Sequence, residues 1–188
     1  PEAYLESIKV HNERIEASIK DPVYHSFVLP QQEKVKELLR QPVIDELWVL
    51  GGNRSGKSRS AAWLVMRSLL ENPNTEIICW SQNESASIER QQPYLWEMMP
   101  QEFKKKQKDE VTKINYSKGT GFAGGKFILP NGSVCYFKYY TQFQQDDTTI
   151  EGAKLGAPKK GCGFINIGTW CDEYLGNEDL LKRLRNRC

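Results

Sequence analysis

The chain lacks the segments that would carry it into or across a membrane. None of its 188 residues belongs to a run that approaches the roughly 20 consecutive apolar residues of a membrane-spanning helix. Charged side chains are spread from Pro1 to Lys20, so this region has no signal-peptide apolar core. We therefore expect a protein that makes no contact with a membrane.

Histidines and closely spaced cysteines are also scarce. The two histidines, His11 and His25, both lie near the N-terminus, and the five cysteines include no C-x-x-C pair. These counts disfavour a histidine-based metal site, a zinc finger and a disulfide framework. A reducing compartment such as the cytosol is the expected location.

No charge of one sign dominates. Lys and Arg number 26 against 24 Asp and Glu, which gives a formal net charge of +2. Nucleic-acid binding therefore cannot rest on bulk charge and would need a local basic patch. Hydrophobic residues make up 39% of the chain and aromatic residues 11%. Disordered chains are poorer in both, and this content is sufficient for one folded core.

Hydrophobic periodicity predicts alternating helices and strands. Helices are expected over 2–20, 31–40, 57–70, 84–98 and 177–187, and buried strands over 46–50, 76–80 and 164–171. Pro93 is expected to kink or split the fourth helix. Because strands alternate with helices, we predict the α/β class, with a mainly parallel sheet flanked by helices.

The middle of the chain has a different character. Asn131-Gly132, a strong turn signal, separates apolar segments at 126–129 and 133–140, which predicts a β-hairpin insertion. Lysines cluster at 104–106 and 108. They are candidates for contact with nucleic-acid phosphates, but charge runs are usually only a solvated surface, which is the favoured interpretation here.

The sequence GGNRSGKS at 51–58 carries the clearest chemical signal. It matches G-x-x-x-x-G-K-[ST] and lies between a predicted strand and a predicted helix, which is the context of a phosphate-binding P-loop. Glycines let successive backbone N–H groups converge on phosphate oxygens, and the helix N-terminus adds a partial positive charge. Lys57 is the expected β/γ-phosphate ligand and Ser58 the expected Mg²⁺ ligand.

An acidic pair follows the last predicted strand. Asp172 and Glu173 end the segment FINIGTWCDEY. In a P-loop ATPase, Asp172 would hold Mg²⁺ through water, and Glu173 would orient and deprotonate the attacking water. Water activation distinguishes such an ATPase from a nucleotide kinase, which excludes water from the reaction.

Four segments, in order, resemble the ATPase domain of the large terminase subunit, the DNA-packaging motor of tailed bacteriophages. They are FVLPQQEKVKELL at 27–39, the P-loop with an internal arginine at 53–58, ILPNGSVCYFKYYTQ at 128–142 with IEGAKLG at 150–156, and the strand that ends at Asp172-Glu173. Together they span about 27–175 of the chain. The resemblance implies a P-loop NTPase core of the ASCE type.

The resemblance also implies a set of site residues. Gln32 occupies the position of the adenine-recognition glutamine, and Arg54 that of a charge-stabilising arginine near the γ-phosphate. The expected cofactors are ATP and Mg²⁺. The expected catalytic residues are Arg54, Lys57 and Glu173, and the expected metal ligands are Ser58 and Asp172. The expected nucleotide-binding residues are Gln32, Gly51, Gly52, Asn53, Arg54, Ser55, Gly56, Lys57, Ser58 and Arg59.

Partners and domain limits follow from the same family. The resemblance implies translocation of double-stranded DNA into a procapsid by a homo-oligomeric ring, a pentamer, that works with the portal protein and a small terminase subunit. The location would be the host cytoplasm during phage assembly. We expect an N-terminal helical extension at 1–26 and a P-loop ATPase domain at 27–188 that is C-terminally incomplete and lacks the family's nuclease domain.

Two alternatives stay open. A helicase-like DNA translocase would share the nucleotide-binding residues and the upstream glutamine, but it would also separate the strands of a duplex. A nucleotide-binding assembly module would bind ATP through 51–58 without turnover in this form of the chain. DNA unwinding and phosphate release distinguish these two functions from a packaging ATPase.

Overall fold

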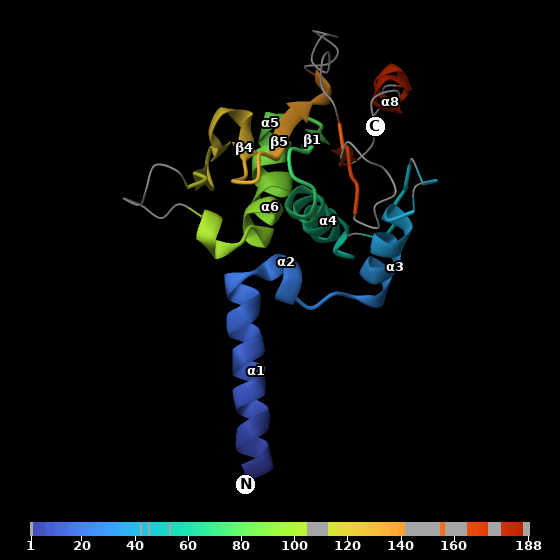
Figure 1. Ribbon diagram of the computed structural model, residues 1–188. Coiled ribbons are helices and arrows are strands. Elements are labelled where there is room, and N and C mark those ends of the chain that lie inside the picture. The colour runs from blue at the N-terminus through green and yellow to red at the C-terminus, as the bar shows by residue number, and fades with distance from the viewer. Residues whose placement is uncertain are drawn as a thin grey trace.

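A computed structural model describes residues 2–41, 43–44, 46–52, 54–104, 113–141, 155–156, 165–172 and 178–185. Its centre is a sheet with the strand order β4-β5-β1-β6 (Figure 1). The strands are β1 (Glu76–Ser81), β4 (Lys126–Ile128), β5 (Val134–Tyr139) and β6 (Thr169–Cys171). β1 runs parallel to both β5 and β6, and β4 is antiparallel to β5. The mainly parallel sheet predicted from the sequence is therefore confirmed.

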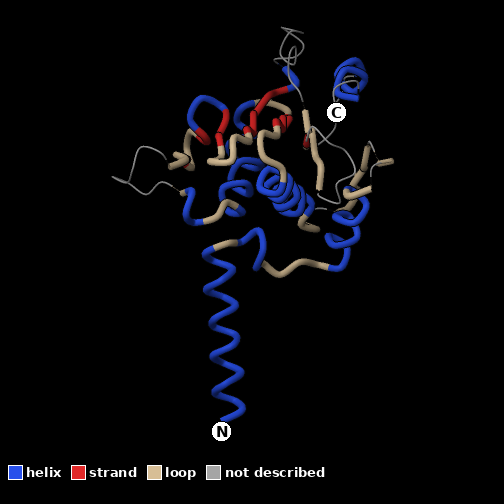
Figure 2. The backbone as a smooth tube through the Cα atoms, viewed as in Figure 1, coloured by secondary structure: helices blue, strands red, loops and turns tan. Residues whose placement is uncertain are grey.

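Helices account for most of the remaining regular structure, as the backbone tube shows (Figure 2). The longer ones are α1 (Glu2–Lys20), α3 (Pro30–Leu39), α4 (Lys57–Glu71), α6 (Gln92–Met98) and α8 (Glu178–Arg185). The short elements are α2 (Pro22–His25), α5 (Glu84–Ala86), the π-helical turn η1 (Ser87–Gln91), η2 (Gln101–Phe103), β2 (Tyr116–Ser117), β3 (Gly121–Phe122) and η3 (Ala123–Gly125).

Strand β1 separates two apolar clusters because its side chains alternate between the faces of the sheet. Ile77 and Cys79 pack into a cluster with residues of α4 and α6. Ile78 and Trp80 pack into a second cluster that contains Leu180 and Leu184 of α8. The molecule is thus layered, with α4 and α6 on one face of the sheet and α8 on the other.

The expected helix at 84–98 is split, as the sequence predicted. The chain forms α5, the π-helical turn η1 and then α6, with Pro93 in the first turn of α6. Proline has no N–H to donate, so the first turn of a helix tolerates it best. In η1, the buried Gln91 side chain donates from Nε2 to the Trp80 carbonyl at 3.1 Å.

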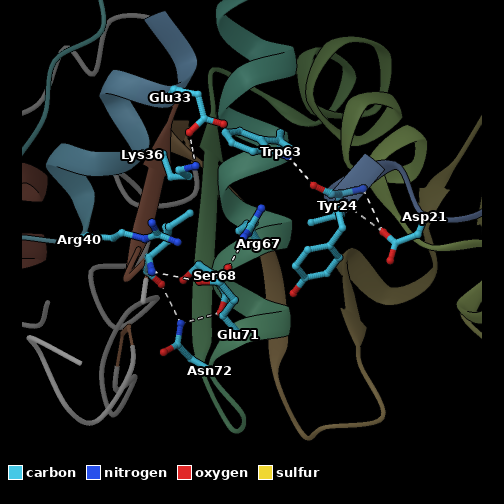
Figure 3. Close-up of polar contacts among 12 residues, drawn as sticks. Asp21, Tyr24, Glu33, Lys36, Arg40, Trp63, Arg67, Ser68, Glu71 and Asn72 are labelled. Atoms are coloured by element: carbon cyan, nitrogen blue, oxygen red, sulfur yellow. Dashed lines mark hydrogen bonds and ion pairs between the residues drawn. The ribbon is translucent and has the colours of Figure 1, made fainter. Parts of the chain in front are cut away.

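Polar side chains at the end of α4 bind the backbone that leads into β6 (Figure 3). The Ile165 amide donates to Glu71 Oε2 at 3.2 Å, and the Ile167 amide donates to Ser68 Oγ at 3.1 Å. Asn72 Nδ2 donates to the Ile165 carbonyl at 2.7 Å. We call Ser68, Glu71 and Asn72 the α4 clamp. The α4 clamp fixes the start of this segment to α4. Because the backbone of 165–167 bonds these side chains, the predicted strand 164–171 pairs with β1 only over Thr169–Cys171.

The predicted buried strand at 46–50 is wrong. These residues adopt no strand, and Trp48, Val49 and Leu50 are 63%, 49% and 88% exposed. An apolar run specifies burial, but a strand also needs a hydrogen-bonded neighbour, and the run does not say which neighbour that is. Residues 47–50 instead face the segment 166–172 across a cavity that both segments line.

The predicted hairpin forms, but it is not an insertion outside the core. β4 and β5 pair around Asn131-Gly132, where Gly132 has φ +83°. β5 is also the direct parallel neighbour of β1 over six residue pairs. The hairpin therefore builds half of the main sheet. The sequence signal identified the turn without showing that the second strand joins the central strand.

The α4 clamp predicts a loss of stability on truncation. Asn72→Ala should lower the free energy of unfolding by about 1–3 kcal/mol, because the buried Ile165 carbonyl would lose its partner. Urea denaturation measures this loss. Gln82→Ala, which truncates an exposed amide between β1 and α5, is the matched control and should be near neutral. Equal midpoints for the two variants would contradict the clamp's role.

Candidate functional site

A cavity of about 1460 Å³ lies between α3, the start of α4, α6 and β6. It exceeds the roughly 300–1,000 Å³ of most ligand pockets. Most of the described residues that the sequence singled out line it: Gln32, Gly51, Arg54, Ser55, Gly56, Lys57, Ser58, Arg59 and Asp172. Gly52 lies beside this lining and contacts Lys57. Asn53 and Glu173 fall outside the described residues.

The loop 51–58 folds around the Lys57 ammonium group. Lys57 Nζ donates to the carbonyls of Gly51 and Gly52 at 2.6 and 2.8 Å, and it lies 3.4 Å from Ser55 Oγ. A Cβ on Gly51 would lie 2.9 Å from Ser55 Oγ, so glycine permits this tight turn. The Lys57 cation is thus held by loop oxygens at the mouth of the cavity.

The loop ends at the N-terminus of α4. Gly56 is the N-cap residue with φ +82°, a conformation that glycine adopts without the penalty of a Cβ. The helix that follows offers unpaired backbone N–H groups and the positive end of its dipole. A helix N-terminus of this kind favours anions, and the Lys57 ammonium group adds a full positive charge beside it.

Gln32 connects α3 to the same helix terminus. Its Nε2 donates to Ser60 Oγ at 2.5 Å, and Ser60 Oγ donates to the Gly56 carbonyl at 2.8 Å. Its Oε1 accepts from the Leu29 amide at 2.7 Å, which caps α3. Both ends of the Gln32 amide are therefore engaged, and the side chain links α3 to the loop.

Two arginines bring positive charge to the cavity wall. Arg54 is exposed and has φ +61°, which is uncommon for a residue with a Cβ. Arg59 Nε bonds Glu97 Oε1 of α6 at 3.0 Å. This ion pair joins α4 to α6, but both side chains are substantially exposed, so its contribution to stability is small.

Asp172 also lines the cavity, directly after β6. Its amide donates to the Trp80 carbonyl at 3.0 Å, and its own carbonyl accepts from Tyr140 Oη at 3.0 Å. The Trp80 carbonyl also accepts from Gln91, so η1 and Asp172 share one anchor on β1. Carboxyl ends of parallel strands meet at one edge of a sheet, which is where α/β proteins place ligands.

Sequence reasoning missed the wall contributed by η1 and α6. Glu89, Arg90, Tyr94 and Glu97 all line the cavity. No motif marks them, and their helical spacing reads as an ordinary solvated face. The one available signal was Pro93, which predicted a break near the site. Interrupted helices of the π type often occur at functional sites.

Burial shifts the pKa of two groups outside the cavity lining. Burial raises the pKa of the Cys79 thiol well above its ordinary value, and a hydrogen bond with Cys135, with sulfurs 3.5 Å apart, adds to the shift. Burial also lowers the pKa of Lys104, whose Nζ lies 5.3 Å from the Trp96 ring centroid. Lys104 thus packs on Trp96 of α6, while Lys105, Lys106 and Lys108 of its cluster fall outside the described residues.

Two other kinds of feature are absent from the described part of the chain. Within them, no three or more His, Cys, Asp or Glu side chains gather where they would hold a metal ion. None of the helices described is both long and apolar enough to cross a membrane.

These features define an α/β protein with a glycine-rich loop at the N-terminus of a helix and an acidic residue at the end of a strand. Residues 48–166 match the family described as terminase large subunit, T4likevirus-type, N-terminal. The chain therefore belongs to this family, as its resemblance predicted. The match includes the loop 51–58 but neither Gln32 nor Asp172. No curated protein and no solved structure matches the chain.

Two glycines of the loop provide a matched test of its geometry. A Cβ would meet no atom within 4 Å at either Gly52 or Gly56, but only Gly56 has a left-handed φ. Gly56→Ala should lower the free energy of unfolding by about 1 kcal/mol or more, whereas Gly52→Ala should be neutral or mildly stabilising. Thermal and urea denaturation measure both. A Gly56→Ala variant as stable as Gly52→Ala would contradict the geometry of the N-cap.

Proposed function

We propose that this chain is the ATP-hydrolysing motor domain of a terminase large subunit, and that it drives double-stranded DNA into a procapsid. Family membership supports the packaging role. The observation that carries the proposal is the single cavity that Gly51, Lys57, Ser58 and Asp172 all line. A P-loop ATPase needs such a lysine, hydroxyl and carboxylate around one nucleotide, so their presence in one cavity supports the proposal.

The residues present fit ATP and Mg²⁺. The cavity is large enough for a nucleotide, and open space adjoins Gly52 and Gly56, where phosphate oxygens would lie. Mg²⁺ binds through few protein oxygens together with substrate phosphates, and Ser58 and Asp172 supply one hydroxyl and one carboxylate. When bound, the metal neutralises charge that develops on the β- and γ-phosphate oxygens.

Lys57 and Arg54 stabilise phosphate charge in this proposal. Lys57 exchanges its bonds to the Gly51 and Gly52 carbonyls for phosphate oxygens, which are stronger acceptors because they are ionised. The exposed Arg54 side chain would contact the γ-phosphate. The backbone N–H groups of 51–58, including Asn53 and Ser55, and the Arg59 side chain complete the nucleotide-binding set.

Glu173 is the proposed catalytic base. It directly follows Asp172 in the sequence. Its carboxylate would take a proton from the attacking water, and the water oxygen would bond the γ-phosphorus as the bond to the ADP oxygen breaks. The proton then leaves with the products as hydrolysis completes.

Gln32 is the proposed adenine reader. Its amide is hydrogen-bonded to Ser60 Oγ, which in turn bonds the Gly56 carbonyl of the loop. An incoming base would therefore meet a side chain that is held in place rather than a freely rotating one. An amide can match the donor and acceptor edge of adenine, which guanine does not reproduce. Recognition of the base would thereby be transmitted to the phosphate-binding loop.

The partners of this motor follow from the family rather than from contacts in the fold. We propose double-stranded DNA as the substrate, and the portal protein and a small terminase subunit as assembly partners. The working form is a homo-oligomeric ring, a pentamer, in the host cytoplasm during phage assembly. Unwinding of a short duplex would indicate the helicase-like alternative instead.

Lys57 tests the proposal directly. Lys57→Ala should weaken Mg-ATP binding at least tenfold, a loss of about 1.4 kcal/mol or more. Isothermal calorimetry measures binding, and phosphate release on the same sample separates an ATPase from a module that only binds. Lys118→Ala, in the exposed turn between β2 and β3, is the control and should leave affinity unchanged. Unchanged affinity in Lys57→Ala would refute the P-loop assignment.

Gln32 tests the base-recognition role. Gln32→Ala should reduce the preference for ATP over GTP, because the amide that distinguishes the two bases is removed. Competition of each nucleotide against a fluorescent ATP analogue measures the ratio of affinities. Gln31→Ala truncates the adjacent amide, which also lines the cavity, and should retain the preference. Identical selectivity in both variants would remove Gln32 from the base site.

A further inference from the structure

The ion pair between Arg59 and Glu97 sets a carboxylate on a cation of the cavity wall. Arg59 follows Lys57 by two residues in the first turn of α4, and Glu97 lies in the last turn of the neighbouring helix α6 (Figure 1). Arg59 Nε lies 3.0 Å from Glu97 Oε1, and both residues line the cavity. The guanidinium group beside the phosphate-binding loop thus has a carboxylate as its partner.

This pair is weak enough for a phosphate to displace the carboxylate. The Arg59 and Glu97 side chains are 39% and 50% exposed, so water screens their attraction. A guanidinium group binds phosphate and carboxylate through the same fork of N–H donors, so the two anions compete for it. A triphosphate held by the loop would offer Arg59 several ionised oxygens, whereas Glu97 offers two.

Lys104 gives Glu97 a second cationic neighbour, outside the cavity lining. Lys104 Nζ donates to the Glu97 carbonyl at 3.4 Å. Burial lowers the pKa of Lys104 and the charge of Glu97 opposes that shift, so the two charged groups attract each other. The Glu97 carboxylate therefore has one cation at the cavity and another away from it.

We propose that Glu97 competes with phosphate for Arg59 and thereby sets the affinity of the site for phosphate-bearing ligands. When a triphosphate binds the loop 51–58, Arg59 leaves Glu97 for a phosphate oxygen, and the Glu97 carboxylate turns to Lys104. The inference rests on the proposed function in that the ligand is a nucleoside triphosphate. It adds a residue of α6 that regulates binding without touching the nucleotide.

Such an exchange suits a site that must release phosphate-bearing products. Product release limits turnover in many enzymes, so a site that binds its products too tightly is slow. Glu97 returns to Arg59 as a phosphate leaves, so the guanidinium group regains an anionic partner. The same exchange makes and breaks one contact between α4 and α6, which links the occupancy of the loop to the cavity wall formed by α6.

Calorimetric titration of the 188-residue chain with inorganic tripolyphosphate and Mg²⁺ tests the competition. Glu97→Gln should tighten binding at least about threefold, because Arg59 would no longer have a carboxylate to leave. In an Arg59→Ala background, the same substitution should tighten binding less than about 1.5-fold, because the contested donor is gone. Glu102→Gln removes an exposed carboxylate of η2 outside the cavity lining. It is the charge-matched control and should stay within about 1.5-fold of the wild type.

Three outcomes would contradict the competition, and they separate it from the proposed function. A Glu97→Gln variant that binds no more tightly than the wild type would overturn the inference alone. An equal gain with and without Arg59 would also overturn it, because general repulsion would then explain the gain. A wild type that binds no tripolyphosphate would overturn the P-loop assignment as well. The expected affinities in a chain that releases no phosphate from ATP would support the inference and contradict the ATPase.

Lys104 tests the second half of the exchange. Lys104→Gln should weaken tripolyphosphate binding at least about twofold, because the displaced carboxylate would lose its second cation. The effect should vanish in the Glu97→Gln background. Lys118→Gln, in the exposed turn between β2 and β3, removes the same charge and should match the wild type. Weakening by Lys104→Gln that persists without Glu97, or no weakening at all, would overturn the exchange with Lys104.

Discussion

The position of the site depends on helix α4 and on the hydrogen bonds at both of its ends. Its first residues form the wall of the loop 51–58, and its last residues form the α4 clamp on the backbone of 165–167. One rigid helix therefore sets the distance between the loop and the strand that ends at Asp172. The helix itself is held by near-complete burial of its middle, from Ala62 to Met66. A substitution in the α4 clamp should therefore shift the cavity wall, because the clamp holds the backbone that leads into β6 and residues 166–172 line the cavity.

The loop is held closed by its own lysine. Lys57 Nζ bonds two neutral carbonyls, so only the donor in each of these bonds is charged. An ionised phosphate oxygen would make the acceptor charged as well and would bind the ammonium group more strongly, so in the proposed function an incoming phosphate can displace these contacts. In that proposal, the same contacts hold the Lys57 ammonium group at the loop until the phosphate charge of ATP would replace them.

The sequence predicted the elements that local rules determine. The glycine-rich loop, the helix after it, the Asn131-Gly132 turn and the break at Pro93 each depend on a few neighbouring residues. The failures concern partners distant in the sequence. Residues 46–50 are apolar enough for a buried strand, but no local signal supplied their neighbour. The α4 clamp could not be predicted from local sequence either, since Ser68, Glu71 and Asn72 bind backbone groups about 95 residues away.

Two asparagines show why burial decides the role of a polar residue on a helix. Asn72 is 9% exposed and bonds two carbonyls, so it contributes to the fold of its own domain. Asn12 lies exposed on α1, where water can hydrogen-bond its amide in the folded and the unfolded chain alike. Removing the Asn12 amide would therefore leave no buried group without a partner, whereas removing the Asn72 amide would leave the buried Ile165 carbonyl unpaired. A polar residue on a helix thus contributes to stability where burial removes water as the alternative partner.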